Sequence, residues 1–349
     1  MTWAEIDWNV LDRLRGLFIS GEAAKGAYWT SSADLANYDL TYGERIGWKW
    51  DAVLRELDQR GWRPPSAAAP ARDGKFALLD WGCGSGIAGR RMIRWLGADH
   101  VAVLRLWDHS ALAADFAEQS ARKSFPGVAV EHLTPGFLAG DAPVGILVIS
   151  HVLNELPAGE LLALRGLASR AEAIVWVEPG TQEVSRALIE LREQLRDRFR
   201  AVAPCTHQGA CGLLAPDNAR HWCHHFAPPQ PGIFADSDWV KFGRRAGIDL
   251  RSLPYSFLAM ERRRKAEPED TAAGFARVIG EPRCYKGFAK VLSCEAGGVS
   301  ERMLQKRDSP GLFKQFGRPE GALVCRWTLA GERIVGGELL SRLTPGGGI

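Results

Sequence analysis

The chain has 349 residues and a formal net charge of +3, with 46 % apolar and 24 % charged residues. This composition allows a large core and is typical of a soluble globular protein. No apolar run reaches membrane-spanning length, so we expect no membrane contact, and the small net charge neither requires nor excludes nucleic acid. The first residues lack the features of a signal or transit peptide, which predicts a protein of the bacterial cytoplasm.

Residues 1–65 are predicted to form a helical N-terminal segment. Apolar residues recur at helical spacing near the start of the chain and again over about 40–60. The stretch 64–70, rich in proline and alanine, is typical of a linker. We expect this segment to pack on the following domain or to cover its ligand.

Strands and helices are predicted to alternate over residues 72–200, the second segment of the chain. Five strands are expected, at about 76–80, 100–107, 128–133, 145–150 and 173–177, followed by a long helix over 182–200. This alternation indicates an α/β fold with a parallel, doubly wound sheet. Several arginines lie along the long helix, and a run of basic residues follows at 262–265. Such stretches are usually solvated faces, and the alternative is contact with RNA.

The first strand of this domain leads into a glycine-rich turn, Leu78-Leu79-Asp80-Trp81-Gly82-Cys83-Gly84-Ser85-Gly86. The three glycines allow a tight bend and a close ligand, and the N–H groups of the next helix face that ligand. Asp80 ends the strand and is placed to accept hydrogen bonds from the ligand. The acid-x-G-x-G-x-G spacing resembles motif I of class I S-adenosylmethionine-dependent methyltransferases and implies that cofactor. A dinucleotide site and a purely structural turn are the alternatives.

Two further strand ends carry candidate cofactor-binding residues. Asp108 follows the second strand, where an acid can accept hydrogen bonds from a ribose diol; the alternative is a cap for the helix over 110–123. The fourth strand ends in Ser150-His151-Val152-Leu153-Asn154. Open α/β sheets bind ligands at the carboxyl edge of the sheet. We therefore add Ser150, His151 and Asn154 to the candidates Asp80, Gly82, Gly84, Gly86 and Asp108.

Residues 201–235 are predicted to form a cysteine-rich metal-binding insertion. Of the seven cysteines, Cys205, Cys211 and Cys223 follow the spacing C-x5-C-x11-C among glycines, prolines and histidines. This setting has little apolar periodicity, which argues against three core cysteines. A histidine is able to complete a zinc site, whereas an iron–sulfur cluster prefers a fourth thiolate, with Cys284 and Cys294 as candidates. Spacing alone leaves both the metal and the fourth ligand open.

Residues 236–349 are expected to hold the remainder of the domain and a small C-terminal β extension. Short strands are predicted at 287–294, 299–306 and 322–329, separated by glycine and proline turns. The extension is expected to hold a ligand at a strand end, or to offer a surface to RNA. Cys325 lies within an apolar run and is expected to be a packing residue.

Together, several segments resemble the methyltransferase-like proteins of small ribosomal subunit assembly, found in mitochondria and in bacteria. The resemblance covers about 40–310 and depends on residues 79–86, 150–156, 177–181, 205–226 and 287–294. It implies a class I methyltransferase (Rossmann-like) fold with a [4Fe–4S] cluster held by Cys205, Cys211, Cys223 and Cys294. The family's Cys-Pro-His reads Cys205-Thr206-His207 here, and Gly212 stands where the family often has proline; neither change removes a thiol.

The resemblance implies an S-adenosylmethionine-dependent methyltransferase that acts on ribosomal RNA. Two alternatives are a non-catalytic, RNA-binding assembly factor and a small-molecule methyltransferase with a zinc site. The sequence has no Asn-Pro-Pro-Tyr tetrapeptide for amino-group methylation and no cysteine placed as a cytosine nucleophile, so no catalytic residue is assigned. The expected partners are the small ribosomal subunit and its rRNA, and the chain is expected to be monomeric.

Overall fold

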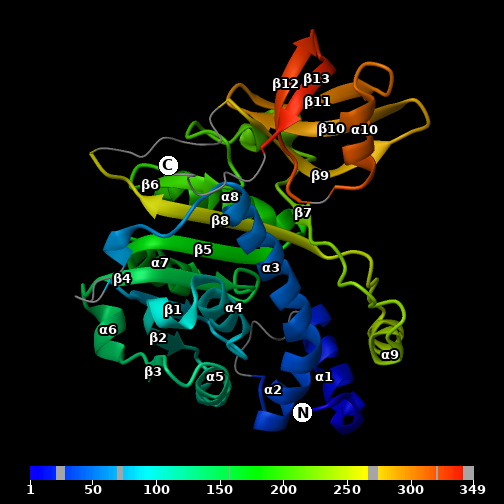
Figure 1. Cartoon of the computed structure of the whole chain (residues 1–349). Helices are drawn as coiled ribbons and strands as arrows, with labels where there is room; N and C mark the ends of the chain where they lie inside the picture. The colour runs from blue at the N-terminus through cyan, green and yellow to red at the C-terminus, as the bar shows by residue number, and fades with distance from the viewer. Residues whose placement is uncertain (21–27, 69–73, 157, 266–273, 320, 341–349) are drawn as a thin grey trace, which may run out of the picture. The chain divides into compact units, whose positions relative to one another are not determined.

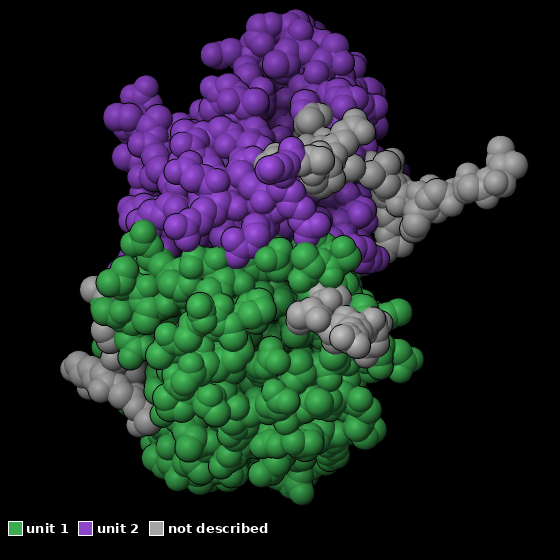
Figure 2. Space-filling model, turned by 90° about the vertical axis from the view of Figure 1, so that its left-hand side faces the viewer, with its two compact units in different colours: residues 1–51, 64–178, 227–253 green, residues 52–63, 179–226, 254–349 purple. Residues whose placement is uncertain are grey.

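The computed structural model describes residues 1–20, 28–68, 74–156, 158–265, 274–319 and 321–340. The chain forms two compact units, coloured separately in Figure 2. Unit 1 comprises residues 1–51, 64–178 and 227–253, and unit 2 comprises residues 52–63, 179–226 and 254–349. The units therefore divide the chain at other positions than the predicted segments. In the part of the chain described, no helix is long and apolar enough to cross a membrane.

Helices make up the N-terminal part of the chain, as the apolar spacing predicted. Their buried side chains include Leu11, Leu14 and Leu35, and the Ser31 hydroxyl caps the second helix by accepting a hydrogen bond from the Asp34 N–H. The helices here and in the rest of unit 1 are α1 (Trp8–Ser20), α2 (Ser32–Tyr38), a π-helical turn (Asp39–Gly43), α3 (Glu44–Gln59), α4 (Ile87–Leu96), α5 (Ala111–Ser124), α6 (Pro135–Ala139), α7 (Ala158–Ala168) and α9 (Ser237–Ala246). Helix α3 continues past residue 51 into unit 2.

The sheet of unit 1 is parallel and has the strand order β3-β2-β1-β4-β5 (Figure 1). Its strands are β1 (Phe76–Trp81), β2 (Val101–Trp107), β3 (Ala129–His132), β4 (Val144–Ser150) and β5 (Ala171–Pro179). Trp81 pairs with Trp107 on one side and with Ile149 on the other. The carboxyl ends of β1, β2 and β4 therefore lie side by side, and the residues that follow these strands share one edge of the sheet.

The predicted long helix over 182–200 is shorter in the structure. Helix α8 spans Gln182–Leu195, and the chain then forms strand β6 (Phe199–Ala203), which pairs antiparallel with β8 (Pro254–Arg262). A short strand, β7 (His225–Phe226), also pairs with β8. Arg200 consequently lies on a strand, where it is buried against Glu261, and is not part of an exposed basic helix.

The C-terminal β extension is a closed barrel with the strand order β10-β11-β13-β12-β9 (Figure 1). The sequence predicted three of its strands with small errors at the ends and did not predict the first strand, the last strand or the helix. Cys325 packs in its core, as expected, together with Val291 and Ile334. The elements are β9 (Ala276–Cys284), β10 (Phe288–Glu295), β11 (Gly298–Gln305), α10 (Pro310–Gly317), β12 (Val324–Ala330) and β13 (Arg333–Leu339).

Candidate cofactor and metal sites

The glycine turn after β1 has one position that is open to a ligand. Gly82, Gly84 and Gly86 have φ angles of 68°, 51° and 76°, a region that L side chains rarely adopt. A Cβ on Gly82 would lie 2.6 Å from Val152 Cγ1, and a Cβ on Gly86 would lie 2.8 Å from Ala117 Cβ. A Cβ on Gly84 would meet no atom within 4 Å. The outer two glycines therefore serve packing, whereas Gly84 faces open space.

Asp80 is fully buried at the end of β1 and uses only one of its carboxylate oxygens within the fold. Its Oδ2 accepts a hydrogen bond of 2.9 Å from the Gly89 N–H, which ties β1 to helix α4. Among the described residues, its Oδ1 has no hydrogen-bond partner. Burial raises the pKa of the Asp80 carboxyl to about 7. This unpartnered oxygen fits a site that awaits a donor from a ligand.

Asp108 follows β2 and binds the glycine turn directly. Its Oδ2 accepts a hydrogen bond of 2.9 Å from the Gly84 N–H, and its Oδ1 accepts one of 2.9 Å from the Ser110 N–H. Ser110, rather than Asp108, is the N-cap residue of helix α5. Each carboxylate oxygen has a second lone pair, so both remain able to accept a hydrogen bond from a ligand.

The polar residues after β4 form a chain of contacts with helix α3. Trp50 Nε1 donates a hydrogen bond of 3.0 Å to Ser150 Oγ, and Ser150 Oγ lies 3.3 Å from His151 Nδ1. The other ring nitrogen of His151, Nε2, lies 3.2 Å from Lys49 Nζ. Burial lowers the pKa of both groups, that of Lys49 to about 8 and that of His151 well below its usual value. The imidazole is therefore neutral and accepts the lysine's hydrogen bond.

His151 also has an unusual backbone conformation. Its φ is 57°, the left-handed region, and it is the one residue other than glycine with a positive φ in the described part of the chain. Such a conformation costs roughly 1–2 kcal/mol and persists only where surrounding contacts hold it. At the carboxyl edge of the sheet, the His151 N–H donates to the Val177 carbonyl oxygen over 2.9 Å, and its ring contacts Ser150 and Lys49.

Carboxyl groups accumulate around the glycine turn. Burial raises the pKa of Glu155 to about 7, with a further contribution from Asp108, and burial also raises the pKa of Asp108 itself. Arg90, the nearest arginine in the sequence, is held by Asp39 at 2.6 Å and by the Ser85 carbonyl oxygen at 2.6 Å. A surplus of buried and half-buried carboxyl groups favours a cationic ligand and disfavours the anionic pyrophosphate of a dinucleotide.

The structure thus brings together most, but not all, of the candidates for cofactor binding. Asp80, Asp108 and the glycine turn form one group at the ends of β1 and β2, and Ser150 and His151 follow β4. Asn154 is exposed, and no hydrogen bond joins it to the other candidates in the described structure. Lys49 could not be predicted as a neighbour of these residues, because its contact with His151 depends on how helix α3 packs beside β4.

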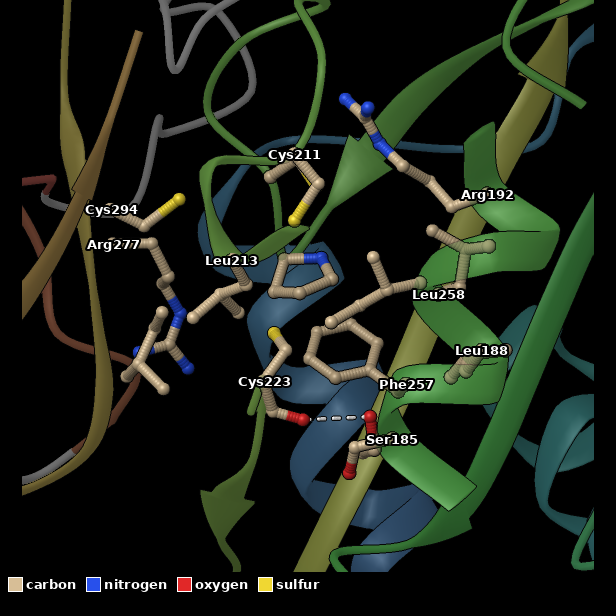
Figure 3. Close-up of a pocket in the computed structure, with 15 residues that line it drawn as sticks. Ser185, Leu188, Arg192, Cys211, Leu213, Cys223, Phe257, Leu258, Arg277 and Cys294 are labelled. Carbon is tan, nitrogen blue, oxygen red and sulfur yellow. Dashed lines mark hydrogen bonds between the residues drawn. The ribbon is translucent and has the colours of Figure 1, made fainter. Parts of the chain in front are cut away.

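The four predicted metal ligands line one cavity in unit 2. Cys205, Cys211, Cys223 and Cys294 border an empty space of about 490 Å³, counting the part that is open to solvent. Figure 3 shows the sulfur atoms of Cys211, Cys223 and Cys294 directed into it. The rest of its wall is mainly apolar and includes Leu213, Phe257, Leu258 and Ile279. Cys284 does not border this cavity and is exposed on β9.

The thiols in this cavity influence one another. Burial raises the pKa of Cys211 to about 11, and the neighbouring Cys205 adds to the rise. The pKa values of Cys223 and Cys294 also rise through burial, with further contributions from Cys205 and Cys211. These thiols are therefore close enough to repel each other as thiolates. A cationic centre would remove that repulsion, as metal coordination does.

Three arginines hold the loop that carries the first cysteines by binding its backbone carbonyl groups. Arg60 donates to the carbonyl oxygens of residues 202, 204 and 205, Arg192 to those of 207 and 209, and Arg186 to those of 213 and 221. Arg60 is itself bound to Glu56, whose other oxygen binds Arg277 at 3.0 Å. Arg192 and Arg277 also border the cavity and place positive charge beside the thiols.

The described ligand atoms of this cavity are not gathered as closely as those around a single zinc ion. In a tetrahedral zinc site with Zn–S bonds of about 2.3 Å, the sulfur atoms lie about 3.8 Å apart. Among the described residues, no three cysteine or histidine ligand atoms of this cavity lie within 4.8 Å of one another. His207 Nε2 lies 3.8 Å from Cys294 Sγ, and His225 Nε2 lies 3.7 Å from Cys223 Sγ. Both distances fit a hydrogen bond to sulfur, and both also equal the spacing of two ligands of one zinc ion, so these histidines stay beside the four thiols as candidate ligands.

Unit 1 has the fold of the class I methyltransferases. Its strand order, its glycine turn after β1 and the acid after β2 all occur in that class, and they are shared with the dinucleotide-binding folds. A family profile described as mitochondrial small ribosomal subunit Rsm22 matches residues 111–319, which is more than half of the chain. The chain therefore belongs to the Rsm22 family.

Comparisons with solved structures found methyltransferases of low sequence identity. A class I S-adenosylmethionine-dependent methyltransferase from Listeria monocytogenes is 10 % identical over 80 % of this chain and 75 % of its own, with a TM-score of 0.40. The magnesium protoporphyrin IX methyltransferase from Synechocystis PCC 6803, solved with S-adenosylmethionine, is 14 % identical over 74 % and 99 %, with a TM-score of 0.39. A methyltransferase from Thiobacillus denitrificans, solved with S-adenosylhomocysteine, is 17 % identical over 57 % and 89 %, with a TM-score of 0.31. The comparison with curated proteins found no match.

Proposed function

We propose that the protein binds S-adenosylmethionine through unit 1 and acts on, or with, the small ribosomal subunit. The observation that carries the cofactor assignment is the set of buried and half-buried carboxyl groups around the open backbone at Gly84. S-adenosylmethionine is a sulfonium cation with an ammonium group, so it complements these carboxyl groups. Asp80 Oδ1 and the free lone pairs of Asp108 are the acceptors that this chain offers to its amine and hydroxyl groups.

The partner is proposed from the family, whose description names the mitochondrial small ribosomal subunit. The cofactor would supply an electrophilic methyl group, and the chain's residues would hold it in line with an acceptor. Sedimentation of lysate at low salt should place the protein with the small subunit, and rising salt should release it if it contacts phosphates. Recovery only at the top of the gradient under mild lysis would contradict the proposal.

A non-catalytic assembly factor is the second candidate. The observation that favours it is the state of Cys83, the one cysteine among the residues of unit 1. Cys83 is buried in the glycine turn, and burial raises the pKa of its thiol far above the usual value, which disfavours a thiolate nucleophile for methylation of a cytosine carbon. Mass spectrometry of rRNA nucleosides from a deletion strain separates the two. One missing methylated nucleoside supports an enzyme, and an unchanged set supports the assembly factor.

We further propose that Cys205, Cys211, Cys223 and Cys294 hold a structural [4Fe–4S] cluster. Four thiols on one cavity suit iron–sulfur ligation, and no three of the described cysteine and histidine ligand atoms there lie within 4.8 Å of one another, as three ligands of a zinc ion would. Arg192 and Arg277 would offset the negative charge that four thiolates bring. The cluster would tie β10 of the barrel to the loop that follows β6.

Metal analysis tests this assignment. Protein purified without oxygen should be brown and contain about four irons per chain. Cys294→Ser should lower the iron content strongly, whereas the matched variant Cys284→Ser, on the same barrel, should leave it unchanged. One zinc per chain in colourless protein would replace the cluster, and a larger loss from Cys284→Ser would show that the fourth ligand is wrong.

A further inference from the structure

The C-terminal barrel has the topology of an oligonucleotide-binding fold. Strands β9, β10 and β11 form an antiparallel meander, and β11 pairs parallel with β13. β12 pairs antiparallel with both β13 and β9, which closes the barrel. Helix α10 lies between β11 and β12 in the chain. This order is that of the five-stranded OB-fold, whose second and third strands and first loop form a common surface for oligonucleotides.

The core of the barrel leaves one part of that surface free. Ala289, Val291 and Leu304 point inward, and Leu312 and Phe316 of α10 pack against them. Because side chains alternate along a strand, the neighbouring residues of β10 face outward. Leu292 and Cys294 on this outer face pack beside the cysteine cavity. The other half of the outer face, around Phe288 and Lys290, is not part of that packing.

The free half of the face carries a stacked pair of aromatic rings. The rings of Tyr285 and Phe288 are 4.6 Å apart with an angle of 18° between their planes. Tyr285 lies in the loop between β9 and β10, and 49 % of its surface is exposed. The Tyr285 N–H donates to the Phe288 carbonyl oxygen over 2.8 Å, which fixes the loop beneath the ring. A fixed, exposed aromatic ring is a platform on which an unpaired base can stack.

Basic side chains surround these rings. The Lys306 N–H donates to the Gly287 carbonyl oxygen over 2.9 Å, which brings the end of β11 beside this loop, and both Lys286 and Lys306 are exposed. Glu301 binds Lys290 at 2.7 Å and also binds Arg283. One acid therefore lies between two cations, and the surface keeps a positive balance that suits the phosphates of a nucleic acid.

We propose that the loop over 284–288 and the adjoining outer faces of β10 and β11 bind single-stranded RNA. A base would stack on Tyr285, and Lys286, Lys290 and Lys306 would contact the phosphates. Single strands fit this surface because their bases are free to leave the stack and lie on an aromatic ring, whereas those of a duplex are not. The inference rests on the proposed function in one respect, because the small-subunit partner makes RNA the natural ligand.

Fluorescence anisotropy with a labelled ten-nucleotide oligouridylate tests the surface in the full-length protein. Tyr285→Ala should weaken binding about tenfold, since stacking of one base is lost. Tyr285→Phe should restore it, because the ring is kept. Phe234→Ala removes another exposed aromatic side chain, from unit 1, and should have no effect. Lys286→Ala should flatten the dependence of log Kd on log salt by about 0.7, the value for one phosphate of a single strand.

Two outcomes would overturn the proposal. Equal affinities of Tyr285→Ala and Phe234→Ala for the oligonucleotide would show that no base stacks on Tyr285. Tighter binding of a ten-base-pair duplex than of the single strand would show that single-stranded RNA is not the ligand. Sedimentation with the small subunit distinguishes a failure of the proposed RNA surface from a failure of the proposed function. Wild type that sediments with the subunit while Tyr285→Ala keeps full RNA affinity contradicts only the surface. Wild type that binds oligouridylate through Tyr285 but never sediments contradicts only the subunit partner.

Discussion

The glycine turn of unit 1 and the cysteine cavity of unit 2 differ in charge and in how they are built. Around the turn, the buried carboxyl group of Asp80 and the half-buried ones of Asp108 and Glu155 gather, and the chain itself fixes the geometry through left-handed glycines. Around the cavity, arginines border the thiols and hold a loop with little regular structure. Carboxyl groups at the first site complement the proposed cationic cofactor, and arginines at the second would offset the charge of thiolates if these bind the proposed cluster. The two therefore respond to different substitutions.

The largest effect is expected from the arginine that holds the cysteine loop. Arg60→Met leaves three buried carbonyl groups without their donor and removes one of the two arginines that bind Glu56. Breaking such a buried pair costs about 3–5 kcal/mol. Denaturation followed by tryptophan fluorescence should show this loss, together with a lower metal content.

The matched control is Arg63→Met, in the same part of unit 2. Its partner is Asp58 at 2.7 Å, and the Arg63 side chain is 61 % exposed. An exposed ion pair contributes about 0–1 kcal/mol, so this variant should keep its stability and its metal. Equal losses in both variants would show that the clamp on the loop adds nothing to stability.

The second prediction concerns the glycine turn. Gly84→Val places a side chain in the open space where the cofactor is proposed to lie, and we expect the affinity for S-adenosylmethionine to fall at least about a hundredfold, or about 2.7 kcal/mol. Gly74→Val is a close control, because Gly74 has a φ of 72° and equally open surroundings but precedes β1. Both variants carry similar backbone strain. Calorimetry should show weak binding only for Gly84→Val, and similar binding by the two variants would contradict the site.

The sequence predicted the parallel sheet well, because each strand is a short apolar run that ends at a turn signal. It placed the end of α8 wrongly for a physical reason. Val184, Leu188 and Leu195 mark a helical stripe, and Phe199 continues it at the right spacing although Phe199 belongs to β6. Phe199 takes the strand conformation because β6 pairs with β8, about sixty residues further along the chain. The local spacing of apolar residues carries no information about that pairing.

The two sites also differ in whether their residues can be recognised from one local segment of the sequence. The glycine turn is local, so Asp80 and its glycines are readable from one segment. The cysteine site also involves Arg60, which directly follows α3 and holds the cysteine loop, and Arg192 of α8 and Arg277 of β9, which line the cavity. All three look like ordinary surface arginines in the sequence. Burial of an arginine depends on partners that are distant in sequence, and no short pattern predicts it.

The third prediction uses the carboxyl groups of the turn as titrating sites. Burial raises the pKa of Glu155 from 4.5 to about 7 and that of Asp80 to about 7. A bound cation favours their ionised forms, so binding releases protons below pH 7. The affinity for S-adenosylmethionine should rise from pH 5.5 to 7.5, by up to about tenfold per pH unit for each proton released. Without the ligand, stability should fall over the same interval, because the folded protein holds these protons after the unfolded chain has lost them.

Calorimetry in two buffers of different ionisation enthalpy counts the released protons directly. Glu155→Gln keeps the shape of the side chain but cannot titrate, so it should remove part of the pH dependence. An affinity that stays constant between pH 5.5 and 7.5, without proton release, would contradict the cationic character of the site.

The smallest effect is expected at the contact between α3 and the end of β4. Burial lowers the pKa of Lys49 from 10.5 to about 8, so below pH 8 the folded protein holds an ammonium group in a place that disfavours charge. Lys49→Met keeps a long side chain and removes that charge, and it should raise the free energy of unfolding at pH 7 by about 1 kcal/mol. The gain should shrink as the pH rises through 8 towards 10, because the wild-type amine then becomes neutral in the folded state.

Lys123→Met, at an exposed position on α5, is the control and should change stability by less than about 0.5 kcal/mol at either pH. If Lys49→Met instead destabilises the protein at pH 7, its hydrogen bond of 3.2 Å to His151 outweighs the cost of burying the charge. The left-handed conformation of His151 would then depend on that lysine.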